Sequence, residues 1–301
     1  LPVLLDEVLE LLVPVLRRQG STYGKRVIID CTVGCGGHAR ALLEASAGKA
    51  MLIGIDLDES ALLKTKQRLA EFAKDVRLFQ ANFSEVRTVM DEAGVKSADV
   101  VLADLGVSSA QIQDASRGFS FQVDGPLDMR MGASGPTAAD IVNTLSQKEL
   151  ADLIYAYSQE RFSREIAAAI VRARKVAPIT RTTQLAEIVT RVIARKSLRR
   201  RWRIHPATRT FQALRIAVNR ELENLSKLLE VLPSLLSVGG RAAIISFHSL
   251  EDRLVKRAFS EMVRAGTHRL LTKKPIRPSP DEIKVNPRSR SARLRCVERI
   301  I

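Results

Sequence analysis

Two short apolar runs on either side of a glycine-rich turn constrain the fold of this chain more than any other feature. The first run, residues 26–30, leads into the turn 31–38, and the second run, residues 51–55, ends at Asp56 after an alanine-rich stretch. Strand, turn, helix and strand in this order are typical of a βαβ unit with buried parallel strands. The sequence therefore predicts an α/β sheet with the glycine turn at the carboxyl edge of its first strand.

The turn and the acid after it predict a ligand. Gly34, Gly36 and Gly37 lack a Cβ, so the backbone can turn sharply and a ligand can lie against it. Asp56 follows about 20 residues later, where an acid in such folds accepts hydrogen bonds from a ribose 2′-hydroxyl. A tight turn that binds nothing is the alternative, but an acid at this distance favours an adenosine-containing cofactor.

Charge and composition indicate a polyanionic partner. The 301 residues include 48 Lys and Arg against 33 Asp and Glu, a formal net charge of +15. Clustered cations release counterions when they neutralise phosphates, so nucleic acid is the expected partner and membrane headgroups are the alternative. No apolar run reaches the ~18 residues of a spanning helix, so we expect a soluble protein without a membrane partner.

The cysteines predict neither a disulfide framework nor a metal site. Three cysteines in a long chain fit a reducing compartment, which is the cytoplasm, or an organellar matrix if a targeting peptide was removed. Cys31, Cys35 and His38 have the spacing of metal ligands, but no fourth ligand is evident in the sequence. We therefore expect no metal.

The apolar runs predict seven strands, of which the last two form a closing pair. They are expected at residues 26–30, 51–56, 76–79, 99–103, 241–246, 268–272 and 294–300. The helices of this part are expected at residues 4–16, from Asp58 or Ser60 to about 72, and from about 213 to 232. Phe83 follows the third strand, where its ring could cover an adenine or pack into the core.

An inserted subdomain interrupts this alternation. After the fourth strand, residues 111–136 form a long irregular stretch rich in Gly, Asp and Arg, and such loops are usually functional. Helical patterns follow over residues 137–193, with Ser146 and Glu149 in a capping-box pattern. We expect one domain from residues 1–112 and 207–301, and a mainly helical insert from residues 113–206.

The densest basic cluster lies at the end of this insert, around the only tryptophan of the chain. Six cations beside one aromatic ring suit phosphate contact with base stacking, although charge runs are commonly solvated faces. The candidate RNA-binding residues are Arg199, Arg200, Arg201, Trp202 and Arg203.

Several longer sequence segments then point to a family. A Gly-x-Gly-Gly turn and a terminal strand pair fit a methyltransferase sheet better than a nicotinamide-binding one. The chain resembles the bacterial MraW family, the cytosine-N4 methyltransferases of small-subunit ribosomal RNA. The resemblance is carried by residues 2–8, 36–38, 104–109, 117–121, 124–131, 210–216, 247–253 and 286–292.

The resemblance implies a class I methyltransferase fold, which is a Rossmann-like, seven-stranded, mostly parallel sheet with an inserted helical subdomain. It implies S-adenosylmethionine as cofactor and a cytosine near the ribosomal decoding centre as substrate, recognised within an assembled small subunit. A homodimer is left open. The implied cofactor contacts are Gly36, Gly37, His38, Asp56, Phe83, Asp104 and Gln111.

The residues that act on the cytosine stay open at this point. Amino-methyltransferases in general have an Asp/Asn/Ser-Pro-Pro-aromatic segment after the fourth strand, whereas residues 104–107 lack the prolines and the aromatic ring. Position at strand ends gives Asp104, Ser108, Ser109 and His248 as catalytic candidates. The candidate stacking partners are Phe119, Phe121 and Phe247.

Two other classes share many of these features. A ribosome assembly factor could keep the cofactor fold without turnover, but it would not need an open pocket beside Asp104. A methyltransferase for a protein or a small molecule would leave the basic insert without a purpose. Methyl transfer from labelled cofactor separates the first alternative from an enzyme.

Overall fold

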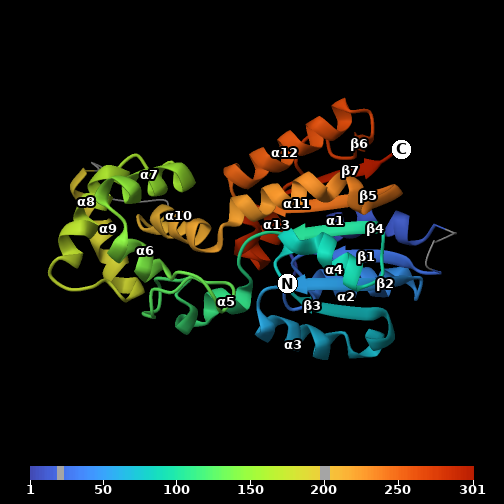
Figure 1. The fold of residues 1–301 in the computed structure, drawn as a ribbon, viewed down its shortest axis with the longest axis horizontal. Helices are drawn as coiled ribbons and strands as arrows, with labels where there is room; N and C mark the ends of the chain where they lie inside the picture. Colours follow the sequence, from blue (N-terminus) through green and yellow to red (C-terminus); the bar gives the residue numbers. More distant parts are fainter. Residues whose placement is uncertain (19–23, 197–203) are drawn as a thin grey trace. The chain divides into compact units, whose positions relative to one another are not determined.

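The computed structural model describes residues 1–18, 24–196 and 204–301, and the chain divides into two compact units. The first unit comprises Leu1–Gly106 and Leu222–Ile301, and the second comprises Val107–Glu221. The first unit has two hydrophobic cores and the second unit has one. Figure 1 gives the labels of the helices and strands. Within the described ranges, no helix is both long and apolar enough to cross a membrane.

The first unit is built on one sheet of seven strands in the order β3-β2-β1-β4-β5-β7-β6. The first five strands are parallel, whereas β7 runs antiparallel to both β5 and β6. This arrangement confirms the predicted seven-stranded, mostly parallel sheet. The strands are β1 (Arg26–Asp30), β2 (Ala50–Asp56), β3 (Val76–Gln80), β4 (Ala98–Asp104), β5 (Leu236–Ser246), β6 (His268–Leu270) and β7 (Arg293–Arg299).

Helices cover both faces of this sheet. The helices of this unit are α1 (Leu5–Leu16), α2 (Gly37–Ser46), α3 (Glu59–Arg68), α4 (Val86–Glu92), α11 (Glu221–Leu235), α12 (Ser249–Arg264) and α13 (Pro280–Val285), and 3-10 segments lie at Ala70–Asp75, Phe83–Glu85 and Pro287–Ser291.

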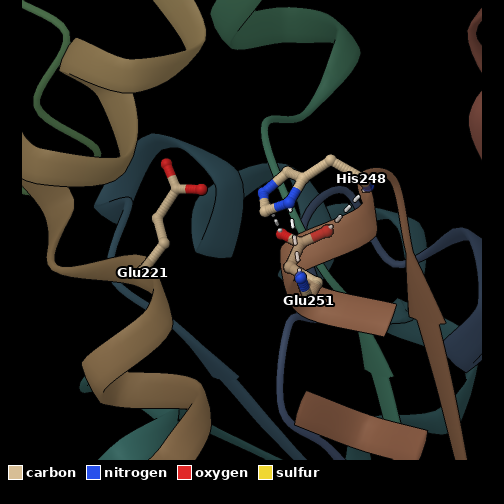
Figure 2. Close-up of side chains that lie close together, drawn as sticks. All are labelled: Glu221, His248 and Glu251. Carbon is tan, nitrogen blue, oxygen red and sulfur yellow. Dashed lines mark hydrogen bonds and ion pairs between the residues drawn. The ribbon is translucent and has the colours of Figure 1, made fainter. Parts of the chain in front are cut away.

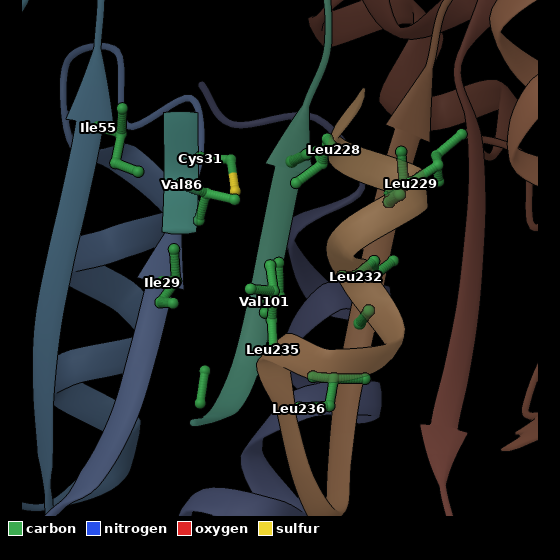
Figure 3. Close-up of a cluster of buried hydrophobic side chains, with 14 of the residues drawn as sticks. Ile29, Cys31, Ile55, Val86, Val101, Leu228, Leu229, Leu232, Leu235 and Leu236 are labelled. Carbon is green, nitrogen blue, oxygen red and sulfur yellow. The ribbon is translucent and has the colours of Figure 1, made fainter. Parts of the chain in front are cut away.

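Alternating strand residues serve two cores, because successive side chains of a strand point to opposite faces. Ile29 and Val101 belong to the core that α4, α11 and α12 cover, and Figure 3 shows leucines of α11 beside Val101. Ile28 and Val100 belong to the core that α1 and α2 cover. With both faces covered, the central strands are apolar throughout, which made them visible as continuous runs in the sequence.

The second unit is mainly helical. It contains α5 (Ser109–Gln113), a 3-10 turn (Ala115–Arg117), α6 (Ala138–Thr144), α7 (Gln147–Ser158), α8 (Ser163–Arg174), α9 (Thr182–Lys196) and α10 (Thr208–Asn219). The predicted capping box of α7 is present, since Ser146 Oγ accepts from the N–H of Glu149 and the Glu149 carboxylate accepts from the N–H of Ser146.

The second unit is longer than the predicted insert of residues 113–206, chiefly because α10 belongs to it. Phe211, Leu214 and Val218 of α10 are buried in the core of the helical unit. The helix expected from about 213 to 232 is in fact two helices, α10 and α11. Arg220 separates them with a φ of 50°, a left-handed conformation that ends a helix.

Candidate functional site

The glycine turn after β1 is held from two sides. The N–H of Gly34 donates to Oδ2 of Asp56 at 2.8 Å, and Thr65 Oγ1 donates to the carbonyl oxygen of Gly34 at 2.6 Å. Asp56 ends β2 and Thr65 lies on α3, so strand, turn and helix meet at this point. The turn is therefore fixed in shape by the polar groups of its neighbours.

The three glycines of the turn have different surroundings. Gly36 has a φ of 74°, and a Cβ there would lie 3.1 Å from the side chain of Thr65. A Cβ on Gly37 would lie 2.7 Å from Pro2, so the start of the chain closes over the turn. A Cβ on Gly34 would meet no atom nearer than 3.8 Å, which leaves its surface open to a ligand.

Three acids gather at the carboxyl edge of the parallel strands. Asp30, Asp56 and Asp104 end β1, β2 and β4. Burial raises the pKa of Asp30 to about 7; the nearby positive form of His38 would lower it, and the charges of Asp104 and Asp56 raise it further. Burial also raises the pKa of Asp56. Burial and the charge of Glu251 raise the pKa of Asp104 to about 7.

His38 lies beside Asp104 and is fixed in one tautomer. Its Nε2 lies 2.9 Å from the carbonyl oxygen of Val3, which can only accept, so Nε2 carries the hydrogen. Burial lowers the pKa of His38, and the neutral ring therefore presents the lone pair of Nδ1. That nitrogen lies 3.7 Å from Oδ2 of Asp104.

Asp104 itself keeps one acceptor unused. Its backbone N–H donates to Thr32 Oγ1 at 2.7 Å, which joins the ends of β4 and β1. Its Oδ1 is buried and has no hydrogen-bond partner among the described residues. A buried acceptor without a donor is costly, so a ligand that donates a hydrogen bond there would be favoured.

The end of β5 supplies His248, which caps α12. Its Nδ1 accepts from the N–H of Glu251 at 3.3 Å, and Oε2 of Glu251 accepts from the N–H of His248 (Figure 2). The same Oε2 also accepts from the N–H of Phe247. Nδ1 is thus unprotonated and Nε2 carries the hydrogen of the neutral ring. Phe247, a candidate stacking partner, packs with the core under α1 and α2.

The other predicted contacts have local structural roles. Phe83 is half-buried and packs against the core under α4, which was the alternative to covering an adenine. Ser108 and Gln111 form a capping box at the start of α5, with Gln111 Oε1 accepting from Ser108 N–H at 3.0 Å. Ser109 begins α5, but its side chain lies outside the described part of the structure.

Two candidate stacking rings and the basic cluster belong to the helical unit. Arg117 lies over the ring of Phe119, and Phe121 stacks on His205 with 4.5 Å between ring centroids. Arg199, Arg200, Arg201, Trp202 and Arg203 lie outside the described residues.

Four residues of the first unit shape this edge although sequence reasoning assigned them no role. Asp30 had a usable signal, because it is an acid that ends an apolar strand just before the glycines. Thr32, Thr65 and Pro2 had none. Each acts through a contact with a residue that becomes its neighbour only in the folded chain.

The comparisons with known proteins agree on one family. The model of the MraW methylase family matches residues 1–300. Similar curated proteins are each called ribosomal RNA small subunit methyltransferase H. They come from Syntrophobacter fumaroxidans (46% identical, over 99% of this chain and 96% of that protein), Geobacter sulfurreducens (47%, over 99% and 98%) and Koribacter versatilis (48%, over 94% and 89%). The chain belongs to the MraW methylase family.

Proposed function

We propose that this chain transfers the methyl group of S-adenosylmethionine to the N4 amino group of a cytosine in small-subunit ribosomal RNA, near the decoding centre. The family supports methyl transfer, and the name of the relatives supports the RNA substrate. The observation that carries the proposal is the cluster of Asp30, Asp56 and Asp104 at one sheet edge of a chain with a net charge of +15. Such a cluster suits a cationic ligand, and S-adenosylmethionine has a sulfonium and an ammonium group.

The residues present fit this cofactor. The open surface of Gly34 allows close approach, the unused Oδ1 of Asp104 can accept a hydrogen bond, and neutral His38 adds no positive charge. When bound, the cofactor supplies an electrophilic methyl group on its sulfonium. The residues proposed to hold it are Gly36, Gly37, His38, Asp56, Phe83, Asp104 and Gln111.

Asp104 is the best candidate to position the amino group. The lone pair of the cytosine N4 amine is delocalised into the ring, so the amine needs an oriented acceptor and a site that excludes water. A carboxyl group whose pKa is about 7 is partly ionised near neutral pH and can accept the proton that leaves nitrogen as the new C–N bond forms. His248 and Ser108 serve as positioning residues in this proposal, because their acceptor atoms cap helices. Ser109 stays a candidate.

The helical unit is proposed to bind the RNA. Val107–Glu221 contains 19 Lys and Arg against 10 Asp and Glu, so it carries +9 of the total charge of +15. Phosphate contacts from such a surface give affinity that falls with salt. Arg199, Arg200, Arg201, Trp202 and Arg203 are proposed to contribute to this surface, within an assembled small subunit.

Mass spectrometry of digested ribosomal RNA tests the proposal. Small subunits that lack the modification are incubated with labelled S-adenosylmethionine and either the wild type or the Asp104→Asn variant, and free ribosomal RNA is treated in parallel. We expect N4-methylcytidine from the wild type with subunits, and little from the variant. Cofactor binding without transfer to either RNA would instead indicate a non-catalytic assembly factor.

A further inference from the structure

A basic segment of the sheet unit, residues 273–293, has no role in the function proposed above, although it includes part of the sequence that carries the family resemblance. It contains 7 Lys and Arg against 2 Asp and Glu, a formal net charge of +5. Lys284 pairs with Asp281, and Arg293 pairs with Asp252. Within the described part of the chain, the other cations of the segment have no acidic partner.

The sheet topology brings the end of this basic segment to the edge where methyl transfer is proposed. β7 runs antiparallel to β5, and Arg293 at the start of β7 lies opposite Ser246 at the carboxyl end of β5. The 3-10 segment Pro287–Ser291 directly precedes β7. It therefore lies at the carboxyl edge of the parallel strands, on the side of β5 that faces away from β2 and the proposed cofactor residue Asp56.

Residues 1–4 connect the basic segment to the glycine turn. On one side, the N–H of Leu4 donates to Oε1 of Glu282 at 2.9 Å. On the other side, the carbonyl oxygen of Val3 accepts from Nε2 of His38 at 2.9 Å. A single stretch of four residues thus separates the basic segment from the turn where the cofactor is proposed to bind.

Arg288 differs from the other unpaired cations of the segment because its side chain is half-buried. Its Nη1 is buried and has no hydrogen-bond partner among the described residues. A buried donor on a charged side chain is costly without an acceptor, and such groups in native proteins commonly have a bound partner. Arg295 of β7 is also buried, but the chain provides Asp252 for it at 2.7 Å. The exposed cations are Lys273, Lys274, Arg277 and Arg290.

The backbone around Arg288 is fixed by its own hydrogen bonds. Ser289 is fully buried, and its Oγ and its N–H donate to the carbonyl oxygen of Asn286 at 2.8 Å and 3.0 Å. The N–H of Ala292 donates to the carbonyl oxygen of Ser289 at 2.7 Å. A guanidinium on a fixed turn loses little backbone freedom when it binds, and its planar fork matches two oxygens of a phosphate.

We propose that Arg288 binds a backbone phosphate of the ribosomal RNA beside the methylated nucleotide, with two guanidinium N–H groups donating to two phosphate oxygens. The proposal rests on the proposed function, since that function brings RNA to this edge. The carboxylate of S-adenosylmethionine offers the same oxyanion chemistry. The strand order favours the phosphate, because Arg288 precedes β7 on one side of β4 and Asp56 ends β2 on the other.

Equilibrium binding to small ribosomal subunits that lack the modification tests the proposal. Affinities of the wild type and of Arg288→Gln are measured from about 50 to 200 mM salt. Loss of one charged phosphate contact should weaken binding about tenfold and reduce the slope of log K against log salt concentration by about one.

Arg264→Gln is the matched control for a lost charge. Arg264 is exposed in the last turn of α12, and that helix starts at the carboxyl edge and carries Arg264 about 24 Å away from it. The control should keep the salt slope of the wild type. Equal losses of affinity and slope in the two variants would overturn the proposal.

Cofactor affinity distinguishes the two sources of an oxyanion. Calorimetry compares S-adenosylmethionine with 5′-methylthioadenosine, which lacks the amino-acid part and its carboxylate. We expect Arg288→Gln to bind both compounds like the wild type. A loss confined to S-adenosylmethionine would assign Arg288 to the cofactor carboxylate and overturn phosphate binding.

A second variant controls for folding. Arg288→Met keeps an apolar stem and removes the buried donor that has no acceptor, so the urea midpoint of the free protein should stay the same or rise. Binding to subunits should fall as in Arg288→Gln. A lowered midpoint would show that the guanidinium is already paired in the free protein and would contradict the proposal.

Methyl transfer by the wild type separates this proposal from the proposed function. A wild type that methylates small subunits, together with an Arg288→Gln variant of unchanged affinity and salt slope, would refute the phosphate site alone. A wild type that binds subunits through Arg288 but methylates no ribosomal RNA would refute the proposed function alone.

Discussion

The backbone N–H of Gly34 donates a hydrogen bond to Oδ2 of Asp56 over 2.8 Å, and Oδ1 of the same carboxylate accepts from the N–H of Asp58 at 2.9 Å. The acid that the sequence assigned to a ribose thus also holds the glycine turn in shape. Each carboxylate oxygen has a second lone pair, so both roles are compatible. Cofactor affinity and stability of the turn should therefore depend on one side chain.

Replacing Asp56 by Ala should lower both quantities. The two N–H groups lose their acceptor, so we expect the free energy of unfolding to fall by about 1–3 kcal/mol and S-adenosylmethionine affinity to fall with it. Urea unfolding and titration calorimetry measure these changes. Asp58→Ala is the control, because the Asp58 side chain caps α3 by accepting from the N–H of Ser60. It should cost about 1 kcal/mol of stability without loss of cofactor affinity. Equal losses of S-adenosylmethionine affinity in the two variants would show that Asp56 has no specific role in cofactor binding.

Sequence reasoning succeeded where one local pattern decides the structure. The strand ends at Asp56 and Asp104 follow from apolar runs, because buried parallel strands are continuous apolar segments. Sequence reasoning failed where the local structure depends on contacts between residues that are distant along the chain. The break at Arg220 is an example, since the sequence on both sides has a helical pattern, whereas α10 packs into the core of the helical unit and α11 into the core of the sheet unit.

The irregular loop after α5 shows the same limit. Its length and its Gly, Asp and Arg content predicted a functional loop but gave no sign that Gly118 and Gly125 serve internal packing. A Cβ on Gly118 would lie 2.2 Å from the carbonyl oxygen of Pro126, and one on Gly125 would lie 1.9 Å from that of Ala115. Neither contact can be read from spacing along the chain, because it depends on how the loop folds back on itself.

His248 offers a test that separates capping from catalysis. Because Nδ1 accepts the N–H of Glu251, His248→Ala should destabilise the protein by about 1 kcal/mol through loss of the cap. His248→Asn should keep most of this stability, since asparagine is a strong N-cap residue. If His248 only positions the segment, the Asn variant also keeps methyl transfer within a few-fold of wild type at saturating cofactor. A large fall in kcat for a fully stable Asn variant would instead assign His248 a direct role.

The ionisation of Asp104 should govern the pH dependence of methyl transfer. Because its pKa is raised to about 7, the acceptor is largely protonated below that pH, and we expect the rate to rise as pH increases through about 7. Asp104→Asn should lose most activity and show no such rise. Rates measured from pH 5.5 to 8.5, a window set by that pKa of about 7, check this. A profile for the wild type that is flat across neutrality would exclude Asp104 as the acceptor.

The same pKa predicts a trend in stability. The folded state binds the Asp104 proton up to about pH 7, whereas the unfolded state releases it near the ordinary value of 3.8. The folded state therefore binds more protons between these limits, and the contribution of Asp104 to the free energy of unfolding falls as pH rises. We expect Asp104→Asn to gain stability relative to wild type from pH 4 to 7 and the gain to level off above that range. The raised pKa of Asp30 changes the free energy of unfolding in the same direction, but Asp30 is present in both the wild type and the variant.

The cysteines predict which atom of the cytosine receives the methyl group. Methylation at C5 needs a thiolate that adds covalently to the ring. Cys31 and Cys296 are buried, and burial raises the pKa of Cys296 to about 12 and that of Cys31 further, so neither is a ready nucleophile. Cys35 is partly exposed but belongs to the glycine turn.

Cys35 has the one thiol of the three that is not buried. Direct transfer to N4 should therefore continue when Cys35 is replaced. We expect Cys35→Ser to keep cofactor affinity and to give N4-methylcytidine at a rate within a few-fold of wild type, because Cys35 lies in the turn and contributes no nucleophile. The product is identified by mass spectrometry against N4- and C5-methylcytidine standards, with Cys296→Ala as the matched control for a buried thiol. A C5 product, or a Cys35→Ser variant that binds cofactor normally but transfers no methyl group, would show that a covalent route operates.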